Sequence, residues 1–238
     1  MTTGAFYLLP SALGDTTWEC YLPPATREAA CRLTRFVAEN AKTARAELKR
    51  IGHPMPLREV AIEQLPEKLG AEDIERLLAP LLAGTDVGLM SEAGCPGVAD
   101  PGALLVRRAH ERGIPVRPLV GPSSLLLALM ASGLDGQRFA FHGYLPQREP
   151  DRSKRIAELE RESARQNQTQ LFIETPYRNA ALFQSLLAAC RPATLLCVAA
   201  DLTLATESVQ TRKIADWRRL PAPALEKRPT VFLLLSAG

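Results

Sequence analysis

The first half of the chain repeats one arrangement, an apolar run that stops at a loop rich in glycine and proline. Val87–Met90 is too short to form a helix of its own, and residues 91–102 after it contain three glycines and two prolines. Glycine releases the backbone angle φ and proline fixes it, so no regular element continues through this segment. The pattern predicts a buried strand followed by a loop.

A helix is expected after this loop. Asp100 is a favourable N-cap, and Pro101 suits the first helical position, where its missing N–H would have no partner. Ala103–Val106 and Ala109 supply an apolar face, and Gly113 ends the pattern. We therefore expect a strand, a loop and a helix in succession.

A second unit of the same kind follows directly. Ile114–Val120 has the pattern of a strand, Gly121–Ser124 that of a tight turn, and Leu125–Ser132 that of a helix. Such units in tandem predict parallel strands, whose ligand crevice lies at their carboxyl ends, so both loops are expected to line one pocket. Ordinary connecting loops explain these residues equally well. Neither loop spells G-x-x-x-x-G-K-[ST] or G-x-G-x-x-G, which argues against the usual diphosphate cradles.

Other elements follow from the same patterns. Ala5–Leu9 predicts a strand that ends at Pro10, and Ala71–Leu82 predicts an amphipathic helix with Ile74, Leu77, Leu78, Leu81 and Leu82 directed inward. Further strands are expected at Phe139–Tyr144, Thr169–Glu174, Thr194–Ala200 and Thr230–Leu235, with helices at Arg152–Gln166 and Ala180–Cys190. Periodicity alone predicts one long helix over residues 25–51, ended by Gly52.

The alternation of strands and helices predicts an α/β protein of two domains. Each half of the 238 residues is long enough to bury its own core. No linker rich in glycine or serine is present, and the best boundary lies within Arg117–Gly121. We place the domains at 1–118 and 119–238.

Composition narrows the class of protein. The chain is 46% hydrophobic and 23% charged, as expected of a globular protein rather than a disordered one. No run approaches the roughly 18–20 apolar residues of a membrane span, and no signal peptide is expected. The five cysteines are scattered without a C-x-x-C pair, which indicates a reduced, cytosolic setting and no metal site. The net charge of +3 neither requires nor excludes a polyanionic partner, and the mixed charges of Arg148–Arg165 favour a solvated helix face.

Four segments together resemble the tetrapyrrole (corrin/porphyrin) methylase superfamily. They are Ser91–Gly102, Gly121–Ser124, Phe141–Pro146 and Glu174–Arg178. Within the superfamily the sequence is most similar to the branch that methylates a ribose 2′-hydroxyl of small-subunit ribosomal RNA. The resemblance runs in order from Tyr7 to the C-terminus, which is more specific than any single motif.

The resemblance implies two α/β domains of the class III methyltransferase type, with S-adenosyl-L-methionine in the cleft between them. It also implies a cytoplasmic homodimer that acts on RNA or the ribosomal subunit. It divides residues 25–51 into a strand near Phe36–Ala38 and a helix from about Ala41 to Arg50. The cofactor-binding residues that it implies are Pro10, Ala93, Gly94, Cys95, Val98, Ser123, Ser124, Glu174 and Thr230.

The acceptor side matches this branch less closely. An expected Asp and Arg are Asn40 and Lys42, and the run Arg-Glu-Leu-Thr-Lys is Ala200–Leu204, without either basic residue. Arg228–Thr230 replaces a Lys-Gly-Glu element, and the helical extension of the rRNA enzymes does not follow Gly238. Losing cations weakens attraction to RNA phosphates.

The catalytic residues remain unassigned. A 2′-hydroxyl is a poor nucleophile that benefits from a general base, for which Asp100, Glu174 and Asp201 are candidates, although helix capping already accounts for Asp100. The leading hypothesis is methyl transfer from S-adenosylmethionine to RNA. Two alternatives stay open: a member that binds the cofactor or a partner without turnover, and a methylase of a tetrapyrrole or another small molecule.

Overall fold

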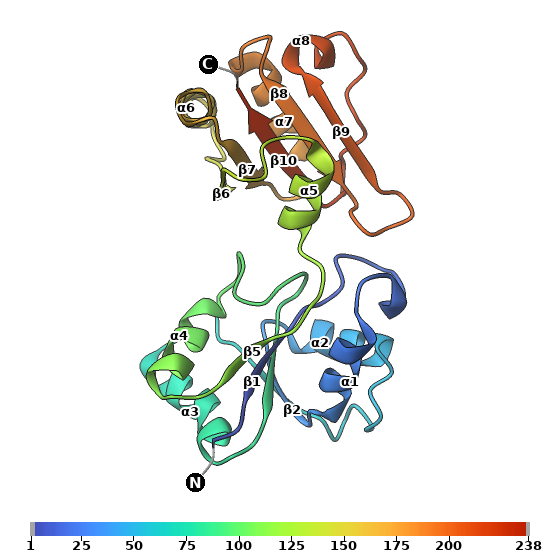
Figure 1. Ribbon diagram of the computed structural model, residues 1–238, viewed down its shortest axis with the longest axis vertical. Helices are drawn as coiled ribbons and strands as arrows, with labels where there is room; N and C mark the ends of the chain where they lie inside the picture. Colours follow the sequence, from blue (N-terminus) through green and yellow to red (C-terminus); the bar gives the residue numbers. More distant parts are fainter. Residues whose placement is uncertain (1–2, 237–238) are drawn as a thin grey trace. The chain divides into compact units, whose positions relative to one another are not determined.

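The computed structural model describes residues 3–236, and the chain divides into two compact units between Ser123 and Ser124 (Figure 1). The sequence placed its boundary at 118/119, before the Gly121–Ser124 turn. Leu119 and Val120 belong with the first unit because both are hydrogen-bonded to it. Leu119 N donates to Leu8 O at 3.0 Å, and Thr26 Oγ1 donates to Val120 O at 2.8 Å.

The first unit contains an entirely parallel sheet. Its strands are β1 (Phe6–Leu9), β2 (Arg35–Ala38), β3 (Ala61–Gln64), β4 (Val87–Met90) and β5 (Val116–Pro118), in the order β3-β2-β4-β1-β5. The predicted parallel arrangement is confirmed, with β1 lying between β4 and β5. The loops that follow all three strands therefore leave the sheet at the same edge.

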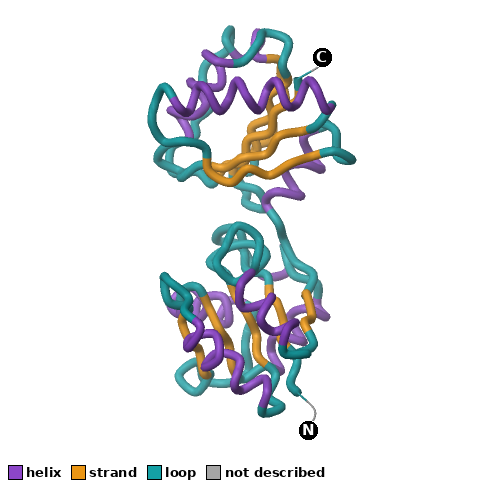
Figure 2. Tube along the Cα trace, turned by 90° about the vertical axis from the view of Figure 1, so that its left-hand side faces the viewer, coloured by secondary structure: helices purple, strands orange, loops and turns teal. Residues whose placement is uncertain are grey.

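Helices cover both faces of this sheet (Figures 1 and 2). They are α1 (Pro24–Arg32), α2 (Ala41–Arg50), α3 (Ala71–Leu82) and α4 (Ala103–Glu111), with a 3₁₀ turn at Trp18–Cys20. One core cluster joins Leu9 and Phe36 to the α1 and α2 side, and another joins Phe6 and Val37 to the α3 and α4 side. Successive residues of each strand alternate between these two cores.

Three expectations for this unit are wrong. Residues 25–51 are not the one helix that periodicity alone predicts, because β2 at Arg35–Ala38 is buried on both faces and that burial overrides the helical spacing. The division implied by the resemblance, a strand near Phe36–Ala38 and a helix from about Ala41 to Arg50, is confirmed. Leu82 was expected to face the core, but its side chain is 36% exposed, because it is the last residue of α3 and follows the last buried residue, Leu81. Asp100 is not the N-cap of α4, which begins at Ala103 with Gly102 in the capping position.

The second unit has a mixed sheet. Its strands are β6 (Phe139–Tyr144), β7 (Thr169–Ile173), β8 (Leu195–Ala200), β9 (Ser208–Lys213) and β10 (Thr230–Leu235), in the order β6-β7-β10-β8-β9. Only β6 and β7 pair in parallel. Because β10 runs antiparallel to both neighbours, the ends of β7 and β8 share an edge with the start of β10.

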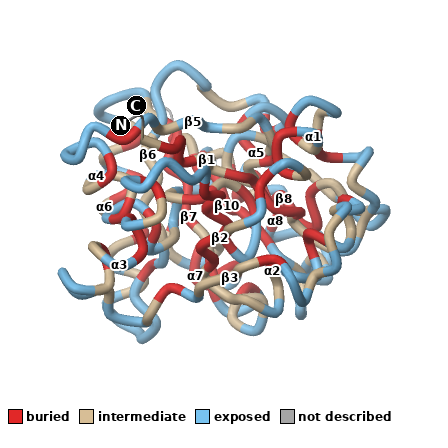
Figure 3. Tube along the Cα trace, turned by 90° about the horizontal axis from the view of Figure 1, so that it is seen from below, coloured by how far each residue is buried: buried red, intermediate tan, exposed pale blue. Residues whose placement is uncertain are grey.

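Four helices accompany this sheet: α5 (Ser124–Ser132), α6 (Asp151–Gln166), α7 (Asn179–Ala189) and α8 (Ile214–Trp217). The core cluster on one face contains Phe172 and Phe232 with apolar residues of α6, α7 and α8. Helix α5 lies against β8, β9 and β10. Buried residues gather along the strands, and exposed ones lie in loops and on outer helix faces (Figure 3). Within residues 3–236, no helix is both long and apolar enough to cross a membrane.

Candidate functional site

The loops after β1, β4 and β5 meet at the carboxyl edge of the first sheet. Ser11 and Gly94 exchange two backbone hydrogen bonds, 2.9 and 3.1 Å between nitrogen and oxygen. The Cys95 thiol donates to Pro122 O at 3.3 Å. The structure thus brings Gly94 and Cys95, which sequence analysis singled out, against the loops that contain Pro10 and Ser123.

Two glycines allow the three backbones to come this close. A Cβ atom on Gly121 would lie only 2.4 Å from Cβ of Pro10, a distance that no side chain tolerates. Gly94 has φ of +72°, in the left-handed region that glycine adopts without strain. Both positions therefore depend on the absence of a side chain.

Two buried serines hold the β4 loop in shape. Ser11 Oγ donates to Ser91 O at 2.9 Å, and Ser91 Oγ lies 3.2 Å from the carbonyl oxygens of both Ala93 and Gly94. Sequence analysis did not single out either serine as a site residue. The available signal was a hydroxyl residue placed directly after a buried strand, once after Pro10 and once after Met90.

The outward-facing part of the loop is small and apolar. Ala93 and Ala99 are exposed, and Val98 is 49% exposed, whereas Gly94 is buried. Cys95 and Ser123 are half-buried. Exposed side chains of this size leave the backbone accessible to a ligand, as a nucleoside-binding surface requires.

Carboxylates from the segments that follow β2 and β4 border this surface. Glu92 N donates to Glu39 Oε2 at 3.1 Å, which connects the end of β2 to the β4 loop. Asp100 Oδ1 accepts from Gly97 N at 2.8 Å and Gly102 N at 2.7 Å, so it closes a turn just before α4. Partial burial raises the pKa of both Glu39 and Asp100, and the Asp100 charge raises the pKa of Glu39 further. This edge therefore presents a negative potential that suits a cationic ligand.

The Cys95 thiol is not an activated nucleophile. Burial raises its pKa, and the nearby charge of Asp100 raises it further. A reactive cysteine needs neighbours that stabilise the thiolate, and here the surroundings favour the thiol. All five cysteines of the chain are free.

The predicted site residues of the second unit lie at the edge where β7 and β8 end and β10 begins. Val231 pairs with Ile173, which places Thr230 beside Glu174, and Thr230 pairs directly with Ala200. Ser124 is the first residue of α5, and none of these strand pairings includes it. Glu174, Thr230 and Asp201 therefore share one edge.

The two carboxylates at this edge, Glu174 and Asp201, each form an ion pair with an arginine. Glu174 accepts two hydrogen bonds from Arg178, at 2.6 and 2.9 Å, and this pairing raises the pKa of the arginine. Asp201 accepts from Arg228 Nε at 2.6 Å and from Thr206 Oγ1 at 2.8 Å. Although Ala200–Leu204 has no basic residue, Arg228 thus brings a cation to the same turn. Sequence analysis missed this contact because 27 residues separate its partners.

Thr203 in this turn has two unusual features. Its φ is +71°, and its hydroxyl oxygen is buried without a hydrogen-bond partner, as is Asn179 Oδ1 in the neighbouring helix α7. The turn is closed by Glu207, whose carboxylate accepts from Thr203 N at 2.8 Å. Strain and unsatisfied polar atoms are more common at functional sites than elsewhere.

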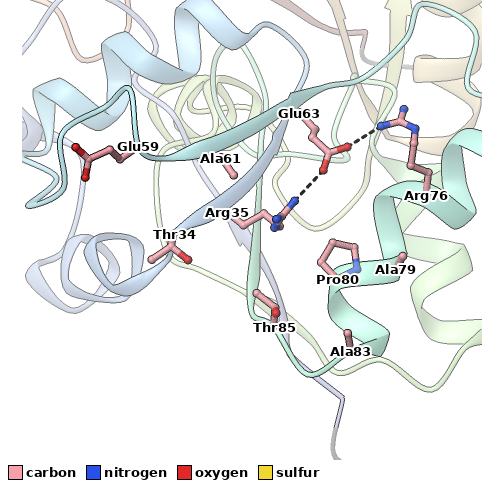
Figure 4. Close-up of a pocket in the computed structure, with 10 residues that line it drawn as sticks. All are labelled: Thr34, Arg35, Glu59, Ala61, Glu63, Arg76, Ala79, Pro80, Ala83 and Thr85. Atoms are coloured by element: carbon pink, nitrogen blue, oxygen red, sulfur yellow. Dashed lines mark hydrogen bonds and ion pairs between the residues drawn. The ribbon is translucent and has the colours of Figure 1, made fainter.

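A cavity of about 680 Å³ lies at the opposite, amino-terminal edge of the first sheet (Figure 4). Glu63 at its wall bridges Arg35 at 3.1 Å and Arg76 at 2.6 Å, so its charges are matched internally. The carboxyl edge is the usual ligand side of a parallel sheet, so this cavity is not the predicted site. No cluster of His, Cys, Asp or Glu suited to a metal ion occurs in residues 3–236.

The family model for Tetrapyrrole (Corrin/Porphyrin) Methylases matches residues 22–217. The chain belongs to the tetrapyrrole methylases. It is therefore a methyltransferase, and the predicted family and fold class are confirmed.

Relatives of this methylase carry one recurrent name. A protein of Xylella fastidiosa (strain Temecula1) named "Ribosomal RNA small subunit methyltransferase I" is 31% identical over 237 residues, which cover 100% of this chain and 82% of the relative. A protein of the same name from Micromonospora olivasterospora is 41% identical over 122 residues, or 50% of this chain and 38% of the relative.

A solved structure supports the fold. The crystal structure of the methyltransferase CobJ superposes with a TM-score of 0.65 at 19% identity, over 99% of this chain and 95% of that one. At this identity the likeness concerns the fold alone. It agrees with the two α/β units described above.

Proposed function

We propose that this methyltransferase transfers the methyl group of S-adenosyl-L-methionine to a ribose 2′-hydroxyl of small-subunit ribosomal RNA. The observation that carries the proposal is the full-length similarity to the Xylella relative of that name. The sequence also resembles the branch of the superfamily whose methyl acceptor is a ribose 2′-hydroxyl. Action on ribosomal RNA also agrees with a cytoplasmic protein.

The residues at the carboxyl edge of the first sheet fit such a cofactor. S-adenosylmethionine, when bound, supplies an electrophilic methyl carbon on a cationic sulfur. Small exposed residues such as Ala93 and Val98 leave room for a nucleoside, and Glu39, Glu92 and Asp100 supply negative charge for a cation. Methyl transfer needs positioning and charge matching more than a nucleophilic side chain, and the inert Cys95 thiol agrees with that requirement.

We assign cofactor contacts to the nine residues that the resemblance implies, in two groups. Pro10, Ala93, Gly94, Cys95, Val98 and Ser123 belong to the first unit, where the loops containing them contact one another. Ser124, Glu174 and Thr230 belong to the second, where Glu174 and Thr230 are neighbours at one sheet edge.

The three candidate bases differ in their surroundings. Glu174 and Asp201 each form an ion pair with an arginine. The contacts of Asp100 are backbone N–H groups, and burial raises the pKa of its carboxyl group. A catalytic role is not assigned to any of them.

Calorimetric titration with S-adenosylhomocysteine tests the cofactor site. Wild-type protein should bind saturably, and Gly94→Leu should not bind, because a side chain at 94 enters the space between Leu13 and Pro122. Gly136→Ala is a matched control, since nothing lies within 4 Å of its Cβ position. Absence of binding to folded wild-type protein would overturn the proposed function.

Transfer of radiolabelled methyl from S-adenosylmethionine tests the acceptor. The substrates compared are small ribosomal subunits, their protein-free RNA and a porphyrinogen. The proposal is supported if alkaline hydrolysis leaves the label in a dinucleotide from one position of the RNA. A 2′-O-methyl group blocks cleavage of the adjacent phosphodiester, so that bond resists alkali. Label in the porphyrinogen, or cofactor binding without transfer to any acceptor, would favour one of the two alternatives instead.

We also propose that two copies of the chain associate. Within the second unit, α5 is apolar on every side, yet Leu126 is 58% and Met130 is 77% exposed. Apolar side chains spaced four residues apart on a helix form a continuous surface that favours a partner. Light scattering should report a dimer for the wild type and a monomer for Leu126→Lys/Met130→Lys.

A further inference from the structure

The outer face of α2 carries an unbalanced stripe of positive charge. Lys42, Arg45 and Lys49 are all exposed, and spacings of three and four residues place them on one side of the helix. Over the residues that the structure describes, no ion pair joins any of these three side chains to a carboxylate. Most other surface arginines of the first unit, such as Arg76 and Arg108, are paired with an acid.

The helix has one acidic residue, and it faces the other way. Glu47 is 2% exposed and is held by Arg50 and by the Tyr21 hydroxyl. Arg50 in turn reaches Asp15 at 3.4 Å. The inward charges of α2 are thus balanced among themselves, and the outward stripe keeps its full charge of three.

Folding does not account for this stripe. Lys42 lies in the first turn of α2, where the helix dipole disfavours a cation by about 0.3–1 kcal/mol. The like charges Arg45 and Lys49, four residues apart, repel each other by roughly 0.2–0.5 kcal/mol. Only Lys49, in the last turn, is favoured by the dipole. Residues that weaken their own helix indicate a role in binding.

The stripe begins at the edge where the cofactor loops converge. Asn40, at the end of β2, caps α2 by accepting from Lys42 N at 2.9 Å and Thr43 N at 3.2 Å. Its neighbour Glu39 holds Glu92 of the β4 loop. From Lys42 the helix leads away from this edge, and at 1.5 Å per residue the stripe extends for about 10 Å.

We infer that Lys42, Arg45 and Lys49 bind phosphates of the acceptor RNA beside its reacting nucleotide. The inference rests on the proposed function. An RNA whose ribose reaches the loops continues past that edge as a chain of phosphates, and a row of uncompensated cations is complementary to it. In this inference the stripe supplies positive charge for RNA to a chain that lacks the basic residues expected at Ala200–Leu204.

The test compares two variants that remove the same charge. Lys42→Gln/Arg45→Gln/Lys49→Gln removes the α2 stripe. Lys154→Gln/Arg161→Gln/Arg165→Gln removes three exposed cations from α6, where Glu158 and Glu162 lie on the same helix face. The probe is unmethylated, protein-free small-subunit ribosomal RNA, and its affinity is measured at several KCl concentrations.

Loss of three phosphate contacts has a defined signature. The slope of log affinity against log salt should become shallower by about 2 to 3, and affinity near 0.1 M salt should fall tenfold or more. The α6 variant should keep the wild-type slope. S-adenosylhomocysteine should bind all three proteins equally, because none of the substituted residues is among those assigned to the cofactor.

Each other outcome identifies what has failed. A wild-type slope for the α2 variant, with methyl transfer intact, overturns the inference and leaves the proposed function standing. Equal losses in both variants indicate a net-charge effect and also overturn it. Loss of binding to phosphatidylglycerol vesicles, with RNA binding unchanged, would assign the stripe to a membrane surface. Failure of the wild type to bind RNA would remove both proposals, even if the cofactor still binds.

Discussion

Gly121 lies against Pro10 so closely that a Cβ atom at position 121 would be 2.4 Å from Cβ of the proline. The two residues belong to loops at the ends of β5 and β1, and the contact sets the distance between those loops. Both loops contain residues assigned to the cofactor. The geometry of the proposed site therefore depends on one missing methyl group.

Gly121→Ala should destabilise the first unit and impair the site. The added carbon must displace Pro10 or the chain around Gly121, which costs about 1–3 kcal/mol in a packed region. We expect a lower thermal midpoint and a weakened affinity for S-adenosylhomocysteine. Gly136→Ala has open space around its Cβ position and should leave both unchanged. Equal behaviour of the two variants would show that the loops tolerate separation.

Replacing the Cys95 thiol should leave methyl transfer largely intact. Burial and the Asp100 charge raise the pKa of this cysteine, so little thiolate exists at neutral pH. Cys95→Ser keeps a donor for Pro122 O and should retain activity within about threefold, a difference of roughly 0.7 kcal/mol. The measurement is the initial rate of label transfer to RNA. A loss of several hundredfold would make the sulfur a participant in the reaction.

Asp100 should make stability depend on pH in a defined direction. Its folded pKa is raised by burial, so the ionised form is disfavoured in the folded state. Its contribution to stability is therefore fully present below the ordinary aspartate pKa and is lost as pH rises through the folded pKa. Asp100→Asn keeps an oxygen for Gly97 N and Gly102 N without the charge. The variant should melt higher than wild type at pH 8, with the difference shrinking towards pH 4.

Asp100→Ala separates hydrogen bonding from charge. It removes the acceptor of two backbone N–H groups, which costs about 1–3 kcal/mol for each partner left unsatisfied. Its thermal midpoint should fall at every pH. If Asp100→Asn and Asp100→Ala behave alike, the carboxylate does not hold the turn.

The strands that sequence analysis found and missed differ in their surroundings. Val87–Met90 and Thr230–Leu235 are buried and apolar, so their patterns locate them correctly. The missed strands, Ala61–Gln64 and Ser208–Lys213, lie at sheet edges, are half exposed and are rich in polar residues. A polar edge strand is defined by its neighbour's backbone rather than by its own side chains, so its sequence carries little signal, whereas the more apolar edge strand Phe139–Tyr144 was found.

The site shows the same limit. Gly94 was predictable because its need, a positive φ in a tight loop, is local, whereas the need for Gly121 comes from its distant contact with Pro10. The partners of the charged residues were not predictable, since Arg228 meets Asp201 across 27 residues and Glu39 meets Glu92 across 53. Those contacts depend on strand order, which the sequence pattern does not specify. Asp100 was expected to cap backbone N–H groups, and it does so. The groups that it caps belong to a turn before α4, however, and not to the helix itself.

Glu174 and Arg178 should couple strongly because the carboxylate is almost fully buried. The Glu174 side chain is 4% exposed and is joined to Arg178 by two hydrogen bonds. Arg178→Gln leaves this charge without its cation. Because the Arg178 side chain is 34% exposed, we expect the loss to cost about 1.5–3 kcal/mol, less than the rupture of a fully buried pair. Glu174→Gln/Arg178→Gln removes the charge as well, so it should recover much of the lost stability. Denaturant unfolding of the wild type, both single variants and the double variant gives the coupling energy.

The same four proteins separate a structural role of the pair from a role in binding. If Glu174 contacts the cofactor, Glu174→Gln lowers the affinity for S-adenosylhomocysteine. The affinity of the double variant then stays low although its stability returns. If the pair only holds the turn after β7, affinity follows stability and recovers in the double variant. Arg35→Gln is the matched control, because it breaks an ion pair to Glu63 at the opposite edge of the other sheet. Arg35→Gln should leave the affinity for S-adenosylhomocysteine unchanged. If this control also lost affinity, the effect of Glu174→Gln would be explained by general destabilisation.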